Sequence, residues 1–534
     1  MSLLRRVDPA LVAILFMALA FRLYRLDVPY VDAHSWRQVT NADIARLWTE
    51  QPINIFFPPV SWGGPHGYVG LEFPLVQALT AVVWRVTGHD EPIGRLVPAA
   101  ISLVSIGLMY MLGRRLFGSP TGRGAAFLVA FSPSYTYFSR TLLSDVPMVC
   151  FSIGAMLGYV RYFFAGDSPS QANRELPAAS RPRDAVIGAA CLALAGLVKV
   201  PAVLVLGPIV WAAWLTRRWR ALQDPWFMSG IAAALGFIAL WYLHADRIYL
   251  ETGLTQAIFR PSGTYAGELG AHAGNFTTVS HWTQWPDQAL GAKLYVVLER
   301  FWDIHLTRLG LAFAVLGMLA FWIPRRTIVD VWLLAGLALV AVSVEGQFNH
   351  EFHQLPLLPP LALYFGMAAG PLFDGARLTA WTRRPVLRVA SLTLVALLWG
   401  GAALWSFAES PVFIALYRPN HLNTGLIDAG RALEAATPAG ALLVTVEYER
   451  FGTNSPMLLY YAHRRGWSFD ATSIRPITIE YLRDAHGACY VATSHWSLLD
   501  AAQRETADYL LRLPELPLRN AHREYRLFDL GCPR

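Results

Sequence analysis

Long apolar runs separated by short polar loops dominate this chain. A helix needs about 20 apolar residues to cross a bilayer. Eleven runs approach or reach that length, near residues 9–26, 93–113, 123–139, 145–164, 184–199, 200–216, 226–245, 306–323, 328–345, 354–373 and 386–408. One further apolar stretch, residues 73–88, is too short to be assigned by length alone. The pattern predicts a multi-span α-helical membrane protein.

The distribution of arginine decides how residues 73–88 are placed, because cytoplasmic loops carry an excess of Arg and Lys. We take the N-terminus as cytoplasmic and 73–88 as a juxtamembrane or re-entrant helix on the outer face. All the arginine-rich short loops then fall inside, with Arg114, Arg115, Arg123, Arg161, Arg174, Arg181, Arg183, Arg217, Arg218, Arg220, Arg325, Arg326, Arg377, Arg383 and Arg384. If 73–88 crossed the membrane, these loops would all move outside. We therefore predict eleven spans and a cytoplasmic N-terminus.

This topology leaves long regions outside the membrane, residues 27–92 and 246–305 and the tail from residue 409. In the tail, LIDAGRALEAATPAGALLVTVEY predicts a helix, a Pro-Gly turn and a strand, and ACYVATSH predicts another strand. We expect a transmembrane domain over residues 1–408 and a small extracytoplasmic α/β domain over residues 409–534. The inner loop 165–183 is polar and low in complexity, which is typical of disorder.

Composition agrees with a membrane protein and excludes a nucleic-acid partner. The chain has 534 residues, of which 54% are hydrophobic and 15% charged, whereas soluble domains are roughly 25% charged. The net charge of +7 comes from arginines in short clusters between apolar runs. Nucleic-acid-binding domains instead present a basic face or stripe.

The four cysteines fall into two groups. Cys150 and Cys191 lie in apolar runs and are expected to be packing residues. Cys489 and Cys532 lie in the tail, where an oxidising compartment would permit a disulfide. The sequence leaves this pairing open.

Ionisable side chains gather at the outer ends of the spans, where such groups are costly and are functional candidates. The first outer loop begins with YVDAHSWRQ, and later span ends contain SRTLLSDVP, GLVKVP and NHEFHQLP. The chain has only two lysines, and one of them lies in this set. The candidates are Asp32, His34, Arg37, Glu72, Arg140, Asp145, Lys199, His350, Glu351 and His353.

Several of these residues also have a structural interpretation. Asp32 could cap the following helix, SWRQVTNADIARLW. Arg140 and Asp145 are five positions apart and could form an ion pair. Lys199 could extend its ammonium group to the membrane interface.

A metal site is left open by the sequence. His350 and His353 are three positions apart and could share a helical face, alone or together with Asp32 and His34. However, lone histidines are more often structural, and no tight ligand spacing supports a metal site. We therefore predict no particular cofactor.

The candidates together suit sugar transfer from a lipid phosphate. A carboxylate at the water-facing surface can take a proton from an acceptor hydroxyl. Fixed cations can stabilise the charge that develops on a departing phosphate. The phosphate of a long-chain lipid lies at this depth of the membrane.

The ordered motifs resemble those of integral-membrane glycosyltransferases of the GT-C type. More narrowly, they are similar to the family of protein O-mannosyltransferases and lipid A aminoarabinose transferases. The similar pieces run from the first loop to about residue 370: Asp32, GLEFPL with Glu72, RLVPAAISLVSIGLMYMLGRRLFG, SPSYTYFSRTLLSDVPM, LAGLVKVPAVL and HEFHQLPLLPPLAL. No single piece is specific, and the resemblance rests on their order.

The resemblance implies a polyprenyl-phosphate sugar donor, an active-site cavity at the outer membrane face and Asp32 as the base. The family often has an Asp-Glu pair where this chain has Asp32 and Ala33. The second group is then His34 or Asp145. The acceptor is an envelope glycan, lipid or protein, and the membrane is expected to be a bacterial plasma membrane.

We expect the remaining candidates to bind substrates. Lys199, with Arg37 or Arg140, would hold the phosphate. Asp145, Glu72 and residues 345–353 would shape the sugar and acceptor sites. One displacement without a covalent intermediate inverts the anomeric centre. The Trp and His residues of 272–285 are expected to form an interfacial aromatic belt.

Two other functions are weighed against this one. A transporter or flippase of lipid-linked sugars would show internal repeats and polar groups at mid-membrane, and the sequence shows no repeat. A non-catalytic subunit of an envelope complex would leave Asp32, Asp145 and Lys199 without a role.

Overall fold

The computed structural model describes residues 8–164, 181–255, 290–320, 324–374, 421–447, 455–519 and 521–531, together with scattered positions between 393 and 408. The predicted loop 165–183, the aromatic segment 272–285 and the last predicted span 386–408 lie wholly or mostly outside these residues. The chain divides into two compact units. The helical unit contains residues 1–26, 96–239 and 284–417, and the mixed unit contains residues 27–95, 240–283 and 418–534.

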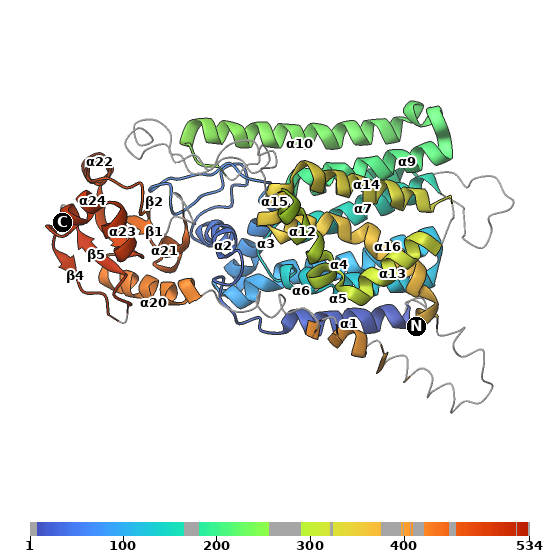
Figure 1. Cartoon of the computed structure of the whole chain (residues 1–534). Helices are drawn as coiled ribbons and strands as arrows, with labels where there is room; N and C mark the ends of the chain where they lie inside the picture. The colour runs from blue at the N-terminus through green and yellow to red at the C-terminus, as the bar shows by residue number, and fades with distance from the viewer. Residues whose placement is uncertain are drawn as a thin grey trace. The chain divides into compact units, whose positions relative to one another are not determined.

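The helical unit is a bundle of α-helices interrupted by short 3-10 and π turns (Figure 1). Two of its helices, α4 and α10, continue into the mixed unit. The elements are α1 (Pro9–Leu23), α4 (Glu91–Phe117), α5 (Ser119–Phe131), α6 (Pro133–Phe138), α7 (Asp145–Phe163), α8 (Pro182–Val198), η2 (Val200–Val205), α9 (Leu206–Arg217), η3 (Arg218–Gln223), α10 (Pro225–Thr252), α12 (Leu290–Arg300), η4 (Phe301–His305), α13 (Thr307–Ala320), α14 (Arg326–Val342), α15 (Val344–Asn349), η5 (Glu351–Leu357), α16 (Leu358–Ala369) and η6 (Gly370–Phe373).

Within the described residues, five helical segments are long and apolar enough to cross a membrane: Glu91–Phe117, Asp145–Phe163, Val200–Gln223, Pro225–Thr252 and Glu351–Phe373. Leu290–His305 and Thr307–Leu319 meet at 102° and would form a sixth, broken span. The protein is therefore an integral membrane protein, and the total of eleven spans stays a prediction. Part of the difference between the predicted spans and the long helices of the structure has a local cause. Pro133 cannot continue the hydrogen-bond ladder of α5, so the predicted span 123–139 is divided into α5 and α6.

Helices α7 and α8 pack closely through facing glycines. A Cβ atom added to Gly158 would lie 2.6 Å from both Cα and N of Gly188. Small residues of this kind let helix backbones approach each other inside a membrane. Asp145 begins α7, and Lys199 follows the last residue of α8. The close approach therefore helps to bring these two side chains together.

We expect Gly158→Ala to destabilise the helical unit by about 1–3 kcal/mol, because the added methyl group overpacks the α7–α8 contact. The thermal unfolding midpoint of the purified protein measures this effect. Gly107→Ala in α4 is the matched control, since nothing lies within 4 Å of its added Cβ. An equal response of the two variants would contradict the close-approach argument.

The mixed unit combines the first outer loop with the C-terminal segment. The loop contributes α2 (Ser35–Glu50) and α3 (Leu75–Thr87). The C-terminal segment contributes α20 (His421–Ala436), β1 (Leu442–Glu447), α21 (Met457–Tyr461), β2 (Arg465–Asp470), α22 (Pro476–His486), β3 (Ala488–Thr493), α23 (Trp496–Ala502), α24 (Arg504–Leu510), β4 (Glu515–Leu516) and β5 (Arg526–Asp529). The boundary at residue 408 stays a prediction.

The five strands form one sheet in the order β2-β1-β3-β5-β4. Strand β1 is parallel to β2 and β3, while β5 is antiparallel to β3 and β4. The sequence of β1, LLVTVE, is buried over nearly its whole length, as expected for a central parallel strand. Helix α22 ends at Gly487, whose φ of +71° provides the left-handed cap that stops it before β3.

The first outer loop covers the free edge of β2. The N–H of Gly466 donates to the carbonyl of Ser61 at 2.8 Å, and the N–H of Gly64 donates to the carbonyl of Gly466 at 2.7 Å. A bridge between Gly63 and Trp467 lies beside them. An open strand edge would otherwise present unpaired backbone groups. The loop and the C-terminal segment are thus hydrogen-bonded parts of one unit.

Helix α3 lies in the short apolar stretch 73–88. The arginine pattern predicts that this stretch does not cross the membrane. It has 13 residues, so it is about 20 Å long, which is less than the roughly 30 Å of a bilayer core. One face buries Val76 and Trp84, while Val82 and Val86 are exposed. This geometry favours a helix that does not cross the membrane.

The structure describes three of the four cysteines. Cys489 is in a disulfide, and Cys150 and Cys191 are free. Cys532 lies outside the described residues.

Glu447 ends β1 and is fully buried beneath the start of α21. Its carboxylate accepts hydrogen bonds from Ser455 Oγ at 2.8 Å and from Leu458 N at 3.3 Å. Burial nevertheless raises the pKa of Glu447 from its ordinary value of 4.5 to about 7. The folded chain therefore holds this proton up to a higher pH than the unfolded chain does.

We expect the stability of the mixed unit to fall as the pH rises through about 7. The contribution of Glu447 is complete below pH 4.5 and lost above pH 7, and it amounts to about 3 kcal/mol. Unfolding midpoints between pH 5 and 8 measure the slope. Glu447→Gln should flatten it, and an unchanged slope in that variant would assign the pH dependence to another group.

Candidate functional site

The predicted site residues occur in both units. The mixed unit holds Asp32, His34, Arg37 and Glu72, and the helical unit holds Arg140, Asp145, Lys199, His350, Glu351 and His353. The two clusters are described separately below.

Asp32 lies in the turn before α2 and is 1% exposed. Its Oδ1 atom accepts a hydrogen bond from Gln38 Nε2 at 2.6 Å, and its Oδ2 atom accepts from Arg95 Nη2 at 3.3 Å. Arg95 Nη1 in turn donates to Gln38 Oε1 at 3.2 Å. Asp32 does not cap α2, because the helix begins at Ser35 with His34 at the N-cap position. The capping interpretation is therefore wrong, and the carboxylate is held by side chains instead.

Arg95, which is absent from the predicted set, is the central cation of this cluster. Its side chain is fully buried at the start of α4, and its guanidinium lies 4.6 Å from the centre of the Tyr30 ring. It also donates to the carbonyls of Val28 and Pro29, each at 3.0 Å. Arg95 thus fixes both the backbone before Asp32 and the carboxylate itself. A signal existed in the sequence, because Arg95 is an arginine at the outer end of a predicted span.

His34 has an unusual backbone conformation, with φ +56° and ψ +35°. This left-handed region is costly for residues other than glycine, by about 1–3 kcal/mol, and such residues cluster at functional sites. Gln38 Nε2 donates to the carbonyl of Ala33 at 2.7 Å and so supports the turn from within. The turn that carries Asp32 and His34 is therefore a strained and well-supported structure.

The two other candidates of the mixed unit, Arg37 and Glu72, follow this turn in the chain. The guanidinium of Arg37 lies 5.4 Å from the centre of the Trp36 ring and is half-buried. Glu72 lies just before α3 and is 9% exposed.

In the helical unit, Asp145 and Lys199 form a buried ion pair. Lys199 Nζ lies 2.7 Å from each carboxylate oxygen of Asp145. Asp145 occupies the first position of α7, where the helix dipole favours a negative charge. The ammonium group also lies 4.7 Å from the centre of the Phe352 ring. Lys199 is thus fixed inside the protein at 6% exposure and does not snorkel.

Arg140 binds the backbone after α1. Its guanidinium donates to the carbonyl of Arg25 at 2.7 Å and to that of Tyr24. Arg140 is fully buried. Arg140 therefore has at least a structural role, because it binds the backbone that follows α1.

Residues 345–353 run from α15 through His350 into η5. Glu345 accepts from Lys293 Nζ at 2.6 Å. The HEFH histidines lie in and beside a 3-10 turn, with the His350 and His353 rings 5.2 Å apart. The two rings are neighbours, as a shared face predicts, but the backbone that carries them is a 3-10 turn and not an α-helix. Glu351 belongs to the same turn and is 9% exposed.

His305 is a buried histidine that the sequence did not single out. Its Nδ1 atom lies 2.7 Å from Ser134 Oγ, and its Nε2 atom lies 2.7 Å from Gln354 Oε1. Both ring nitrogens are therefore hydrogen-bonded, and His305 links α6, the bend at η4 and η5. Among the described residues, no three His, Cys, Asp or Glu side chains are grouped to hold a metal ion. The metal question stays open.

An apolar cavity lies beside the Asp145–Lys199 pair in the helical unit. It has a volume of about 20 Å³ and is lined from α7, η2, α14, η5 and α16 by residues that include Met148, Pro201, Val205, Trp332, Pro356 and Pro359. Met148 follows Asp145 by three positions, and Pro201 follows Lys199 by two. The cavity has room for roughly one water-sized group and is far below the volume of a small-molecule site.

The family comparison covers part of both candidate clusters, including Glu72, Asp145 and Lys199. Residues 71–243 match a family model described as dolichyl-phosphate-mannose-protein mannosyltransferase. No curated protein matches the chain in sequence.

Solved structures match at low sequence identity. ArnT from Cupriavidus metallidurans, bound to undecaprenyl phosphate, has 15% identity and a TM-score of 0.59, with 98% of this chain and 99% of ArnT covered. AglB, an oligosaccharyltransferase from Archaeoglobus fulgidus in complex with an inhibitory peptide and a dolichol-phosphate, has 12% identity and a TM-score of 0.52, with 93% and 72% covered. The arabinofuranosyltransferase AftD from Mycobacteria has 14% identity and a TM-score of 0.54, with 98% and 41% covered.

At these identities the structural matches show the fold, which is that of membrane glycosyltransferases of the GT-C type. Together with the family match, they confirm the resemblance predicted from the sequence.

Proposed function

We propose that this protein is a glycosyltransferase that moves a sugar from a polyprenyl-phosphate donor to an acceptor of the cell envelope. The environment of Asp32 carries the proposal, because a buried carboxylate aligned by Arg95 and Gln38 is suited to activating a hydroxyl. The family match and the fold support the same enzyme class. ArnT binds undecaprenyl phosphate and AglB binds a dolichol-phosphate, which supports a lipid-phosphate donor.

Asp32 takes the proton of the acceptor hydroxyl, or orients that hydroxyl, as it attacks the anomeric carbon. The bond between this carbon and the phosphate oxygen breaks, and polyprenyl phosphate leaves. Because the acceptor enters opposite the departing phosphate, the product has the inverted configuration. Arg95 and Gln38 position Asp32 and are not themselves expected to touch the sugar. His34 is the candidate second group in the same turn.

Lys199 holds the donor phosphate, with Arg37 or Arg140 as the second cation. An ammonium group has three donors, so Lys199 can keep Asp145 as a partner while it binds phosphate. Arg140 also binds the backbone carbonyls of Tyr24 and Arg25.

The remaining features of the proposal concern topology and acceptor. We infer eleven spans, a cytoplasmic N-terminus and an extracytoplasmic C-terminal α/β domain over residues 409–534, in a bacterial plasma membrane. Glu72 and residues 345–353 shape the sugar and acceptor sites. The acceptor is a glycan, lipid or protein of the envelope.

Donor turnover tests the proposal. The purified protein is incubated with a panel of radiolabelled polyprenyl-phosphate sugars and envelope extract. We expect release of polyprenyl phosphate together with label in a new product. Transport of intact donor across vesicles without its consumption would instead identify a flippase.

A further inference from the structure

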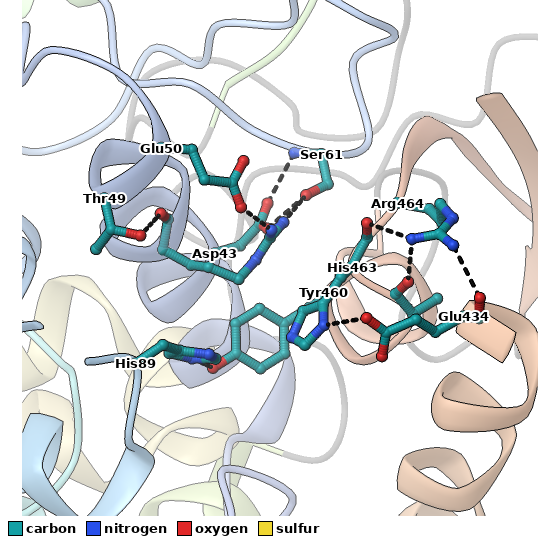
Figure 2. Close-up of polar contacts among 11 residues, drawn as sticks. Asp43, Thr49, Glu50, Ser61, His89, Glu434, Tyr460, His463 and Arg464 are labelled. Carbon is teal, nitrogen blue, oxygen red and sulfur yellow. Dashed lines mark hydrogen bonds and ion pairs between the residues drawn. The ribbon is translucent and has the colours of Figure 1, made fainter. Parts of the chain in front are cut away.

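Helix α21 of the C-terminal segment contacts the first outer loop close to the proposed base. The hydroxyl of Tyr460 lies 2.9 Å from His89 Nε2, and Met457 Sδ accepts a hydrogen bond from Ser35 Oγ at 4.0 Å. Tyr460 is 1% exposed. Figure 2 shows Tyr460 directed at His89, with Asp43 and Ser61 nearby. One short helix therefore contacts both the start of α2 and the segment that precedes α4.

A buried ion-pair network fixes the position of Tyr460. Arg46 lies 5.9 Å from the centre of the Tyr460 ring. Its guanidinium donates to Asp43 Oδ1 at 3.0 Å, to Ser61 Oγ at 3.1 Å and to Glu50 Oε1 at 2.7 Å. Asp43 also accepts from the backbone N–H of Ser61 at 2.7 Å. A connected network of this kind in a buried region is rigid.

His89 belongs to the segment that clamps the Asp32 turn. Two residues later, Glu91 Oε2 accepts from the backbone N–H of Tyr30 at 2.9 Å, and the carbonyl of Glu91 accepts from the Tyr30 hydroxyl at 3.1 Å. Arg95, farther along the same segment, binds Asp32. A displacement of His89 would therefore act on the backbone immediately before Asp32.

His89 is suited to a fixed contact of this kind. Burial lowers its pKa to about 4, and the charge of Arg46 contributes to the lowering. The ring is therefore neutral near pH 7. Without the Tyr460 hydroxyl, Nε2 would lose its hydrogen bond in a largely buried place.

We propose that α21 is a positioning element for catalysis. The contacts of Tyr460 with His89 and of Met457 with Ser35 hold the strained Tyr30–Ser35 turn so that Asp32 faces the acceptor. This inference rests on the proposed function. It assigns the C-terminal segment a role in the chemical step through Asp32. Tyr460, His89 and Met457 act through the turn and do not touch the substrate.

The test compares Tyr460→Phe, His89→Ala and His89→Gln in the full-length protein. We expect Tyr460→Phe and His89→Ala to lower kcat about tenfold and to leave the KM for the donor within about twofold. His89→Gln keeps an acceptor for the Tyr460 hydroxyl and should restore most of kcat. Glu515→Gln is the control, because it breaks the exposed pair with Arg526 at the β4–β5 edge.

Hydrogen exchange of the peptide covering residues 30–38 is the second readout. Exchange should become faster in Tyr460→Phe and stay unchanged in Glu515→Gln. If Tyr460→Phe does not fold, Met457→Leu replaces it, since this change removes only the contact of the sulfur atom.

The possible outcomes separate the two proposals. If wild type is active and Tyr460→Phe keeps both kcat and slow exchange, the role of α21 is overturned and the proposed function stands. If the variant raises KM and leaves kcat unchanged, α21 serves donor binding and the positioning role fails. If wild type consumes no donor, the proposed function fails, and the exchange measurement alone decides whether α21 holds the turn.

Discussion

Asp32→Asn should abolish most of the turnover of the protein that remains folded. Asparagine keeps the shape of the side chain and can still accept one hydrogen bond, but it cannot accept a proton. General-base catalysis typically contributes about 10²–10⁴-fold, so kcat should fall by that factor. The KM for the donor should change little, because the donor phosphate is assigned to Lys199. Transfer of label from the donor to the product at saturating donor measures the effect.

A matched control is available in the same unit. Asp470 at the end of β2 is also buried, and its Oδ1 atom accepts from Thr472 N at 2.6 Å. Asp470→Asn therefore neutralises a buried carboxylate far from Asp32 in sequence and should keep near wild-type kcat in the protein that remains folded. Turnover of Asp32→Asn within about threefold of wild type would show that Asp32 is not the base, given the size of the expected loss.

Lys199→Met should reduce kcat/KM for the donor by about 10²–10³-fold, chiefly through KM. Removal of one partner of a buried, hydrogen-bonded charge pair at a binding site costs about 2–5 kcal/mol. The same change leaves Asp145 buried without its ammonium partner at 2.7 Å, which destabilises the fold by about 3–5 kcal/mol. Loss of activity in this variant alone would therefore be ambiguous.

The double variant Lys199→Met with Asp145→Leu separates the two effects. Replacement of a buried ion pair by apolar residues is often neutral or stabilising, so the thermal midpoint should return towards wild type. Activity should stay low, because no ammonium group remains to bind the phosphate. If both stability and activity recovered, the Asp145–Lys199 pair would have only a structural role.

The sequence indicates which ionisable residues at span ends are candidates, but it does not indicate their partners. Asp145 and Lys199 were identified because ionisable groups at a span end are costly. Their pairing joins residues 54 positions apart, and it depends on how closely α7 and α8 approach at Gly158 and Gly188. Such contacts depend on three-dimensional packing, which the pattern of apolar positions does not contain.

The cluster around Asp32 shows what sequence reasoning can miss. Arg95 could have been found, since an arginine at the outer end of a span departs from the inside preference of that residue. Gln38 gave no comparable signal, because a glutamine in a polar helix is ordinary until its partner is known. His34 was selected for its chemistry, whereas the structure adds its left-handed backbone.

Local breaks account for other differences. The 3.6-residue pattern predicts a continuous helical face through HEFH, but the backbone there is a 3-10 turn, in which residues i and i+3 lie above one another. Proline has a similar effect at Pro133, where one apolar run becomes two helices. Apolar runs locate the helical segments and give less information about where each one is interrupted.

The pairing of the first outer loop with β2 also sets an order of events during synthesis. Arg465 donates to the carbonyl of Pro65 across 400 positions of the chain. At about 5–20 residues per second, the ribosome needs on the order of 20–80 s to make the intervening chain. Throughout that interval the loop with Asp32 has left the ribosome without its partner strand. The proposed catalytic turn is therefore completed last, so that a nascent chain is inactive until its C-terminal segment has been made.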